Sequence, residues 1–298
     1  MKKVAIQGGG GSNHEIAAKA YFETDNIATV ECNSFEELFS TLKEDHSIYG
    51  IIAIENTLVG SILQNYTLLK DSGMVIIGEY KLRIKHQLLA LPGERLEDIR
   101  EVHSHPMALA QCSDFFKQYP HIKMISRDDT ALSGKWIRDN QLKGMAAIAP
   151  ALAAEKYNLD IIAKDIETNK RNFTRFLIIS HKEKIALEDI LTQQPINKSS
   201  LVFALPHAEG SLSKVLSILA FYNINLSKIQ SLPVVGSEWE YLFYIDLVFE
   251  DYKRYQQSLN AIRPLTRNLK SLGEYHVGKR SFDTVSNDNK PLSEQKTF

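Results

Sequence analysis

The chain has little of what marks a secreted, membrane-bound or nucleic-acid-binding protein. Its 298 residues include two cysteines, Cys32 and Cys112, and neither belongs to a CxxC or a Cys/His pattern, so neither a disulfide framework nor a zinc site is indicated. No apolar run approaches the roughly 18 residues of a membrane span. The net charge of −1 gives no overall attraction to nucleic acid or to an anionic membrane.

The composition that remains is that of a globular protein with more than one core. Hydrophobic residues make up 44% and charged residues 24% of the chain, and this length predicts about two domains. The apolar run that follows Lys2 and Lys3 is too short for a secretory signal. We therefore expect it to form a first strand, and we expect a cytoplasmic protein.

Strand-like and helix-like segments alternate through the first 180 residues, which predicts an α/β unit with mostly parallel sheets. One of the expected helices begins after Ser34, a plausible N-cap with Glu37 as its capping-box partner. The expected strands are 3–7, 51–55, 74–84, 87–91, 102–103, 123–126, 145–148 and 174–180. The expected helices are 13–22, 34–44, 62–69, 107–118, 130–140 and 150–157.

A second unit follows a polar linker and has the order βαββαβ. Its expected elements are strand 200–205, helix 211–222, strands 225–232 and 240–249, helix 252–268 and strand 270–277. The last residues, from Gly278 to Phe298, are polar and lack periodicity, and we expect them to be disordered.

Two polar clusters border apolar runs that would be buried strands. Asn172 to Phe176 places a threonine beside an arginine, and Glu55 to Ser61 follows another apolar run. A hydroxyl and a fixed cation suit an anionic substrate that must lose an oxygen, and ligands of open α/β sheets lie at the carboxyl ends of strands. Asn56 and Thr57 are equally typical of a helix-capping turn.

A third candidate site is the run from Gly8 to Ser12, which joins a strand to a helix. Backbone N–H groups at a helix start can bind an anion, whereas a flexible turn is the alternative. The run is neither a Walker A loop nor a Rossmann fingerprint, because no Lys-Ser/Thr follows and Asn13 occupies the third glycine position. His103 and His105 lack an acidic or thiol companion, so no metal site is predicted.

Taken together, these segments resemble the prephenate dehydratase family over roughly residues 3 to 277. The resemblance rests on Asn172-Phe173-Thr174-Arg175-Phe176, on Glu55-Asn56-Thr57, and on Ser104-His105-Pro106 followed by Gln111-Cys112. It implies a two-lobed catalytic domain like periplasmic binding proteins over residues 1–182. Lobe 1 would be 1–79 and 160–182, and lobe 2 would be 80–159.

The same resemblance implies a reaction and roles for particular residues. The reaction is the decarboxylative dehydration of prephenate to phenylpyruvate, a carbon–oxygen lyase reaction that needs no cofactor and no metal. Thr174 is the implied catalytic residue, helping the hydroxyl to leave. Arg175 would bind substrate or pair with a structural acid, and Phe176 would bind substrate or pack in the core. The other implied substrate-binding residues are Asn172, Glu55, Asn56, Thr57, Ser61, Ser12, Ser104, Gln111 and Thr130.

The C-terminal unit resembles an ACT regulatory domain with a ferredoxin-like βαββαβ fold, expected at 198–278 after a linker at 183–197 and before a tail at 279–298. ACT domains pair side by side, so a homodimer or homotetramer is expected, and L-phenylalanine is the implied effector. Gln230 and Leu232 replace the acid and the arginine of the family signature, so the effector stays open. The expected effector-binding residues are His207, Gly210, Ser211, Leu212, Asn225, Gln230 and Ser231.

Two other functions remain open at this stage. One is arogenate dehydratase, which uses the aminated substrate, and turnover of each substrate would separate the two. The other is a ligand sensor without catalysis, which Thr174 in its family setting argues against. No binding to nucleic acid or to a membrane is expected.

Overall fold

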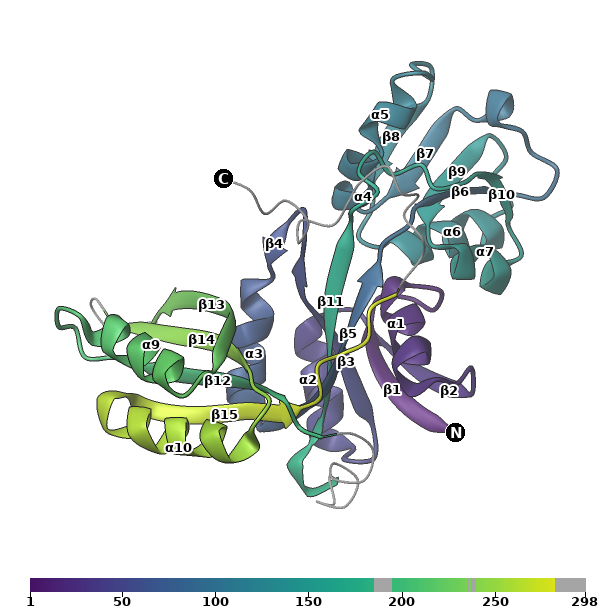
Figure 1. The fold of residues 1–298 in the computed structure, drawn as a ribbon. Helices are drawn as coiled ribbons and strands as arrows, with labels where there is room; N and C mark the ends of the chain where they lie inside the picture. Colours follow the sequence, from purple (N-terminus) through teal and green to yellow (C-terminus); the bar gives the residue numbers. More distant parts are fainter. Residues whose placement is uncertain (185–194, 235, 237–239, 282–298) are drawn as a thin grey trace.

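The computed structural model describes residues 1–184, 195–234, 236 and 240–281, and its strands form three separate sheets (Figure 1). The first two sheets belong to two lobes of an α/β unit. The third forms a layered unit beside the first lobe. The predicted α/β class with a βαββαβ C-terminal part is therefore confirmed.

The first sheet has the order β2-β1-β3-β11-β5, with β4 paired to β3. Strands β1, β2 and β3 are parallel, whereas β11 is antiparallel to both β3 and β5. The bounds are β1 Lys2–Gln7, β2 Ile27–Cys32, β3 Tyr49–Asn56, β4 Gly60–Ser61, β5 Met74–Arg83 and β11 Phe173–His181. As expected for a mostly parallel sheet, β1, β2, β3 and β5 run in the same direction, while β11 and the two-residue β4 run against them.

Helices cover both faces of this sheet, and alternation along the strands divides its core into two layers. Val4 and Ile6 pack on the α1 side with Ala17 and Phe176, while Ala5 faces the layer of α2 and α3. Ser34 caps α2 by accepting a hydrogen bond from the Glu37 N–H at 3.2 Å. The Glu37 carboxylate reaches Asn33 N instead of completing the expected box. The helices are α1 Asn13–Phe22, α2 Phe35–Glu44 and α3 Leu63–Ser72.

The second sheet has the order β10-β6-β9-β7-β8. The expected helix at 107–118 is instead two short helices separated at Cys112. The expected lobe limits at 80 and 160 also differ, because β5 stays in the first sheet to Arg83 and β10 pairs with β6. The elements are β6 Gln87–Ala90, β7 Glu101–Ser104, α4 Pro106–Gln111, α5 Ser113–Phe116, β8 Lys123–Ser126, α6 Thr130–Asp139, β9 Met145–Ala149, α7 Ala151–Tyr157 and β10 Asp160–Ala163, with a 3₁₀ turn η1 at Leu96–Asp98.

The third sheet is antiparallel throughout, with the order β13-β14-β12-β15. One face packs under α9 and α10 through Phe203, Ile245 and Tyr255. The other face adds Val202, Tyr244 and Leu272 to the core of the first lobe. The elements are β12 Lys198–Ala204, α9 Ser211–Phe221, β13 Asn225–Pro233, β14 Tyr241–Val248, α10 Tyr252–Ile262 and β15 Arg267–Tyr275, with 3₁₀ turns η2 at Lys182–Lys184 and η3 at Arg263–Leu265.

After β15 the chain runs back along the first lobe (Figure 1, yellow). Lys81 donates its N–H to Lys279 O, and Ser281 donates its N–H to Lys81 O. Residues 279–281 therefore extend the edge of β5, which corrects the expectation that the tail is disordered from Gly278. The rest of the expected tail, 282–298, lies outside the described residues.

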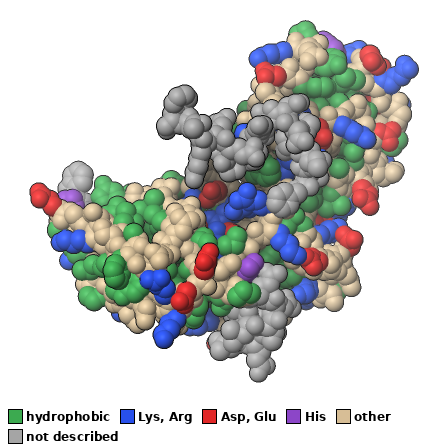
Figure 2. Space-filling model, viewed as in Figure 1, with side chains coloured by type: hydrophobic (Ala, Val, Ile, Leu, Met, Phe, Trp, Pro, Cys, Tyr) green, Lys and Arg blue, Asp and Glu red, His purple; other side chains and the backbone are tan. Residues whose placement is uncertain are grey.

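The distribution of charge on the surface is relevant to the partners that this protein can bind. Acidic and basic side chains are interspersed over the face drawn in Figure 2, in line with a net charge of −1. Within the described ranges, none of the helices has the length and apolar character needed to cross a membrane.

Candidate active site at the crossing between the lobes

Thr174 lies at the start of β11, where the carboxyl end of β3 meets it. The register pairs Thr174 with Asn56 on one side and with Leu82 of β5 on the other. The Thr174 residue is 8% exposed and Asn56 is 9% exposed. Both side chains therefore sit at the border of the core, with a small part of each residue still exposed.

The Asn56 side chain orients the Thr174 hydroxyl. Its Nδ2 donates to Thr174 Oγ1 at 3.0 Å and to Asn172 Oδ1 at 2.7 Å. Its Oδ1 accepts from the N–H groups of Leu58 and Val59, so the amide cannot be flipped without losing these bonds. Because Thr174 Oγ1 already accepts a hydrogen bond, its own proton is left to donate elsewhere.

Asn172 and Gln111 extend this network to the second lobe. Asn172 Nδ2 donates to Gln111 Oε1 at 2.9 Å, and Gln111 is the last residue of α4. The chain passes between the lobes twice, near residues 84–86 and 166–172. These two segments run side by side, because Ile84 N donates to Asn172 O and Ile166 N donates to His86 O. The site therefore stands on the double crossing that joins the lobes.

His86 belongs to the same network, and sequence reasoning missed it. Its Nε2 lies 2.8 Å from Gln111 Oε1, and since that amide oxygen only accepts, the ring carries its proton on Nε2. Burial lowers the pKa of His86, so the ring stays neutral near pH 7. The sequence signal for His86 was a polar residue between two apolar strand segments, where the chain passes from the first lobe to the second.

Several predicted substrate-binding residues do not face Thr174. Arg175 points to the opposite side of β11, where its Nε contacts Glu79 at 2.6 Å and its Nη1 contacts Asp246. The alternative that Arg175 pairs with a structural acid is the one the contacts support. The physical reason is the period of two in a strand, which sends neighbouring side chains to opposite faces.

Glu55 and Ser61 also turn away from Thr174. Lys228 of β13 donates to Glu55 Oε2 at 2.7 Å and to Ser61 Oγ at 2.9 Å. Phe176 is 1% exposed and packs edge-on against His14 at 5.0 Å between ring centroids. For Phe176 the contacts support the packing alternative, whereas Glu55 and Ser61 contact the third sheet.

Thr57, Ser104 and Thr130 have local structural partners. The Thr57 hydroxyl donates to Arg171 O and accepts from Phe173 N, which fastens the loop before β11. The Ser104 hydroxyl is fully buried and donates to Ile148 O at 2.7 Å. Thr130 is the first residue of α6, but the cap is Asp129, whose carboxylate accepts from Leu132 N.

The glycine run forms a contact between the lobes instead of an open anion site. Gly10 N donates to Glu31 Oε1 at 2.9 Å, and Gly11 N donates to Glu15 Oε2 at 2.7 Å. These protein carboxylates already use the N–H groups that were expected to bind substrate. Gly11 is required, because its φ is +82° and a Cβ would lie 2.7 Å from Ala153 Cα.

Ser12, also predicted to bind substrate, follows this loop. Its hydroxyl is buried and has no hydrogen-bond partner among the described residues.

The expected effector residues lie in three places in the C-terminal unit. His207, Gly210, Ser211 and Leu212 are at the start of α9, and the partly exposed Gln230 and Ser231 are near the end of β13. Asn225 begins β13, beyond the far end of α9. This helix has 11 residues and so spans about 16 Å, which means that one chain does not bring Asn225 to Gly210.

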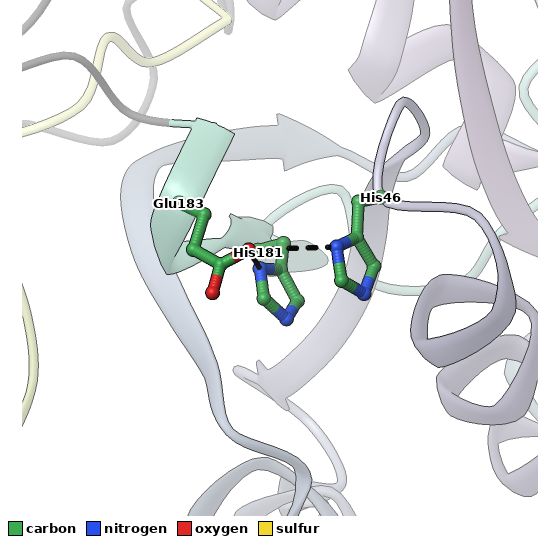
Figure 3. A group of neighbouring side chains, drawn as sticks. All are labelled: His46, His181 and Glu183. Carbon is green, nitrogen blue, oxygen red and sulfur yellow. Dashed lines mark ion pairs between the residues drawn. The ribbon is translucent and has the colours of Figure 1, made fainter.

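The described residues contain one group of side chains with metal-binding donors, His46, His181 and Glu183 (Figure 3). Glu183 Oε2 lies 3.8 Å from His46 Nδ1 and 3.9 Å from His181 Nδ1. The two rings are stacked 3.6 Å apart at 12°, so their in-plane lone pairs run side by side and do not converge on one point. This arrangement does not provide the tetrahedral donor set that zinc prefers.

The amino-acid sequence matches the family model described as prephenate dehydratase over residues 4–184. A bifunctional chorismate mutase/prephenate dehydratase of Buchnera aphidicola is 34% identical over 89% of this chain and 68% of that relative. An arogenate dehydratase/prephenate dehydratase of Arabidopsis thaliana is 38% identical over 92% of this chain and 73% of that relative.

Solved structures share the fold of most of the chain. Prephenate dehydratase from Arthrobacter aurescens in complex with L-Phe is 25% identical, with a TM-score of 0.79, and the match covers 92% of this chain and 89% of that chain. A protein described as a quorum-quenching acylase is 27% identical, with a TM-score of 0.82, covering 93% and 98%. Since one fold serves different chemistries, the activity has to be argued from the site.

Proposed function

Since this chain belongs to the prephenate dehydratase family, we propose that it converts prephenate to phenylpyruvate and that the Thr174 hydroxyl donates a hydrogen bond to the leaving oxygen. The observation that carries the role of Thr174 is the bond from Asn56 Nδ2 to Thr174 Oγ1. It occupies one lone pair of the hydroxyl oxygen and leaves the threonine proton to be donated to another group. A preorganised donor of this kind stabilises charge that develops only in the transition state.

The substrate supplies the driving force for the reaction. When its ring carboxylate leaves as carbon dioxide, the bonding electrons enter the ring and expel the hydroxyl at the opposite carbon, and the ring becomes aromatic. The departing hydroxide takes up a proton and leaves as water. A hydrogen bond from Thr174 to that oxygen lowers the barrier most when negative charge is largest.

The groups around Thr174 suit this reaction because they are uncharged. Asn56, Asn172 and Gln111 are amides, and burial keeps His86 neutral by lowering its pKa. A cation held against the ring carboxylate would stabilise it as an anion and oppose its loss as carbon dioxide. Arg175, the cation beside Thr174 in the sequence, is occupied by Glu79 and Asp246 on the other face of the strand.

The test is the formation of phenylpyruvate from prephenate by the purified full chain. We expect turnover of prephenate to exceed that of arogenate under the same conditions. A chain that releases no aromatic product from either substrate would contradict the proposal. Faster turnover of arogenate would move the assignment to the aminated substrate.

For the third sheet we propose an ACT regulatory domain at 198–278, joined to the catalytic domain of residues 1–182 by a linker at 183–197, of which 185–194 lie outside the described residues. The βαββαβ order supports this, as does the related structure crystallised with L-Phe. Phenylalanine is the proposed effector, bound by His207, Gly210, Ser211, Leu212, Gln230 and Ser231. Asn225 fits the same site only if a second copy supplies it.

We further propose a cytoplasmic homodimer or homotetramer. β13 is an edge strand of the third sheet, and an unpaired edge is able to pair with a second copy. Sedimentation with and without phenylalanine tests the assembly, and turnover at increasing phenylalanine tests the inhibition. A monomer whose rate does not change with phenylalanine would contradict both proposals.

A further inference from the structure

The strand pair β3–β11 carries two neighbouring residue pairs that serve different parts of the molecule. The register sets Asn56 opposite Thr174 and, one position along, Glu55 opposite Arg175. Asn56 and Thr174 are hydrogen-bonded to each other. Glu55 and Arg175 face the third sheet instead, and their side chains lie 3.6 Å apart between Oε2 and Nη1.

The third sheet contacts both members of this charged pair. Lys228 of β13 holds Glu55 at 2.7 Å, and Asp246 of β14 holds the guanidinium of Arg175. Tyr275 of β15 accepts from Arg175 Nη2 at 3.1 Å. Glu55, the neighbour of Asn56, and Arg175, the neighbour of Thr174, are therefore both bound to the C-terminal unit.

The contacts around Arg175 are buried and balanced in charge, whereas the Glu55 side chain held by Lys228 is 38% exposed. Arg175 is 7%, Asp246 5%, Glu79 1% and Lys198 3% exposed. Burial alone would raise the pKa of Glu79, but the charges of Arg175 and Lys198 hold it at about 2. Buried ion pairs give little net stability because desolvation offsets their attraction, and their best-attested use is to select one arrangement.

The third sheet is also seated too closely to slide independently of the first lobe. A Cβ on Gly273 of β15 would lie 2.2 Å from Ile76 O, and one on Gly278 would lie 2.0 Å from Glu79 O. Ile76 and Glu79 belong to β5, the neighbour of β11 in the sheet. A displacement of the third sheet would therefore press on β5, which is hydrogen-bonded along its length to β11.

We propose that Glu55 and Arg175 are positioning residues, through which Lys228 and Asp246 of the C-terminal sheet set the orientation of Asn56 and Thr174. This inference rests on the proposed function of Thr174. It assigns the C-terminal sheet a part in the basal reaction, separate from any effector. Moving Lys228 shifts Glu55 and with it Asn56, because adjacent residues of a strand move together, and small misplacements at a reacting centre reduce rates strongly.

The main test is Lys228→Met in the full chain, which keeps the apolar stem and removes the ammonium group. The matched control is Lys253→Met, an exposed lysine on α10. We expect kcat for prephenate to fall about ten-fold in Lys228→Met with KM changed less than two-fold, because Lys228 contacts Glu55 and Ser61 and not the Thr174 network. Lys253→Met should match the unaltered chain, and Lys228→Arg should recover most of the rate.

A second readout separates positioning from a general loss of stability. In chains with labelled threonine methyl groups, the Thr174 signal is identified by its absence from Thr174→Val. We expect Lys228→Met to shift this signal and Lys253→Met to leave it in place. Asp246→Asn, which keeps the shape of the side chain but removes the negative charge that faces Arg175, should shift it as well.

The possible outcomes are distinguishable. If the unaltered chain does not turn over prephenate, the proposed function fails. If it does, and Lys228→Met has an unchanged kcat and an unshifted Thr174 methyl signal, the positioning role is refuted. A fall in kcat that Lys228→Arg does not recover, with the methyl signal unmoved, would also overturn it in favour of a structural role.

Discussion

Replacing Thr174 by valine tests the centre of the proposed mechanism. The change removes the hydroxyl and keeps the branched shape of the side chain at a position that is 8% exposed. Asn56 Nδ2 loses Thr174 Oγ1 as an acceptor but still donates to Asn172 Oδ1 at 2.7 Å. One of the two N–H donors of Asn56 Nδ2 loses its partner, a local cost that the fold should tolerate.

The expected magnitudes differ strongly between stability and rate. Loss of one neutral hydrogen bond costs about 1 kcal/mol of unfolding free energy. Loss of a donor aimed at a leaving oxygen costs about 10²–10³ in kcat, which corresponds to about 2.7–4 kcal/mol in the transition state. The rate should therefore collapse in a chain that remains folded and binds substrate.

The assay is phenylpyruvate formation at saturating prephenate, beside a thermal unfolding scan of each variant. Thr174→Ser is the matched control, because it keeps the hydroxyl and should retain far more activity than the valine variant. If Thr174→Val kept a tenth or more of the rate, the hydroxyl would not be the donor and the proposed mechanism would be wrong.

Three further predictions concern titration and packing. Burial lowers the pKa of His14 to about 4, so His14 should stay neutral in the folded protein down to pH 5. Because the unfolded chain takes up this proton at about pH 6.5, the folded protein should lose stability as the pH falls from about 6.5 towards 4. A ring titration by NMR with a midpoint above pH 6 would contradict this. The pKa of Glu79 is lowered from 4.5 to about 2, worth about 3 kcal/mol. That stability is present above pH 4.5 and lost as the pH falls to 2, so unfolding curves of Glu79→Gln and the unaltered chain should converge over this range, and parallel curves would refute it. Gly11→Ala should destabilise the chain by several kcal/mol, because it combines φ +82° with a contact of 2.7 Å to Ala153; an unchanged melting temperature would show that the lobes separate freely there.

Strands and helices were largely predictable because hydrophobic periodicity is a local property. The runs at 51–55 and 174–180 became the centres of β3 and β11, and the βαββαβ order of the C-terminal unit was read correctly. β2 and β10 were missed, since Ile27–Cys32 and Asp160–Ala163 are only partly buried and carry little periodicity. The direction of β11 could not be predicted, because it depends on where the chain re-enters the first sheet.

The sequence predicted the region of the site, and the structure showed which of the predicted residues contact one another. Asn56, Asn172, Thr174 and Gln111 form one hydrogen-bonded network, whose members are up to 118 residues apart. Whether each of them touches substrate remains a prediction. The sequence pointed to the right strand ends, but it could not say which face each side chain takes once a register is chosen.

Residue order alone determined that a threonine and an arginine would be adjacent on a strand, and that the strand would be apolar beyond them. Tertiary structure alone decided that the threonine meets Asn56 between the lobes while the arginine meets Glu79 and Asp246 under the third sheet. The physical reason is that a strand sends alternate side chains to opposite faces, and only the folded chain decides what covers each face.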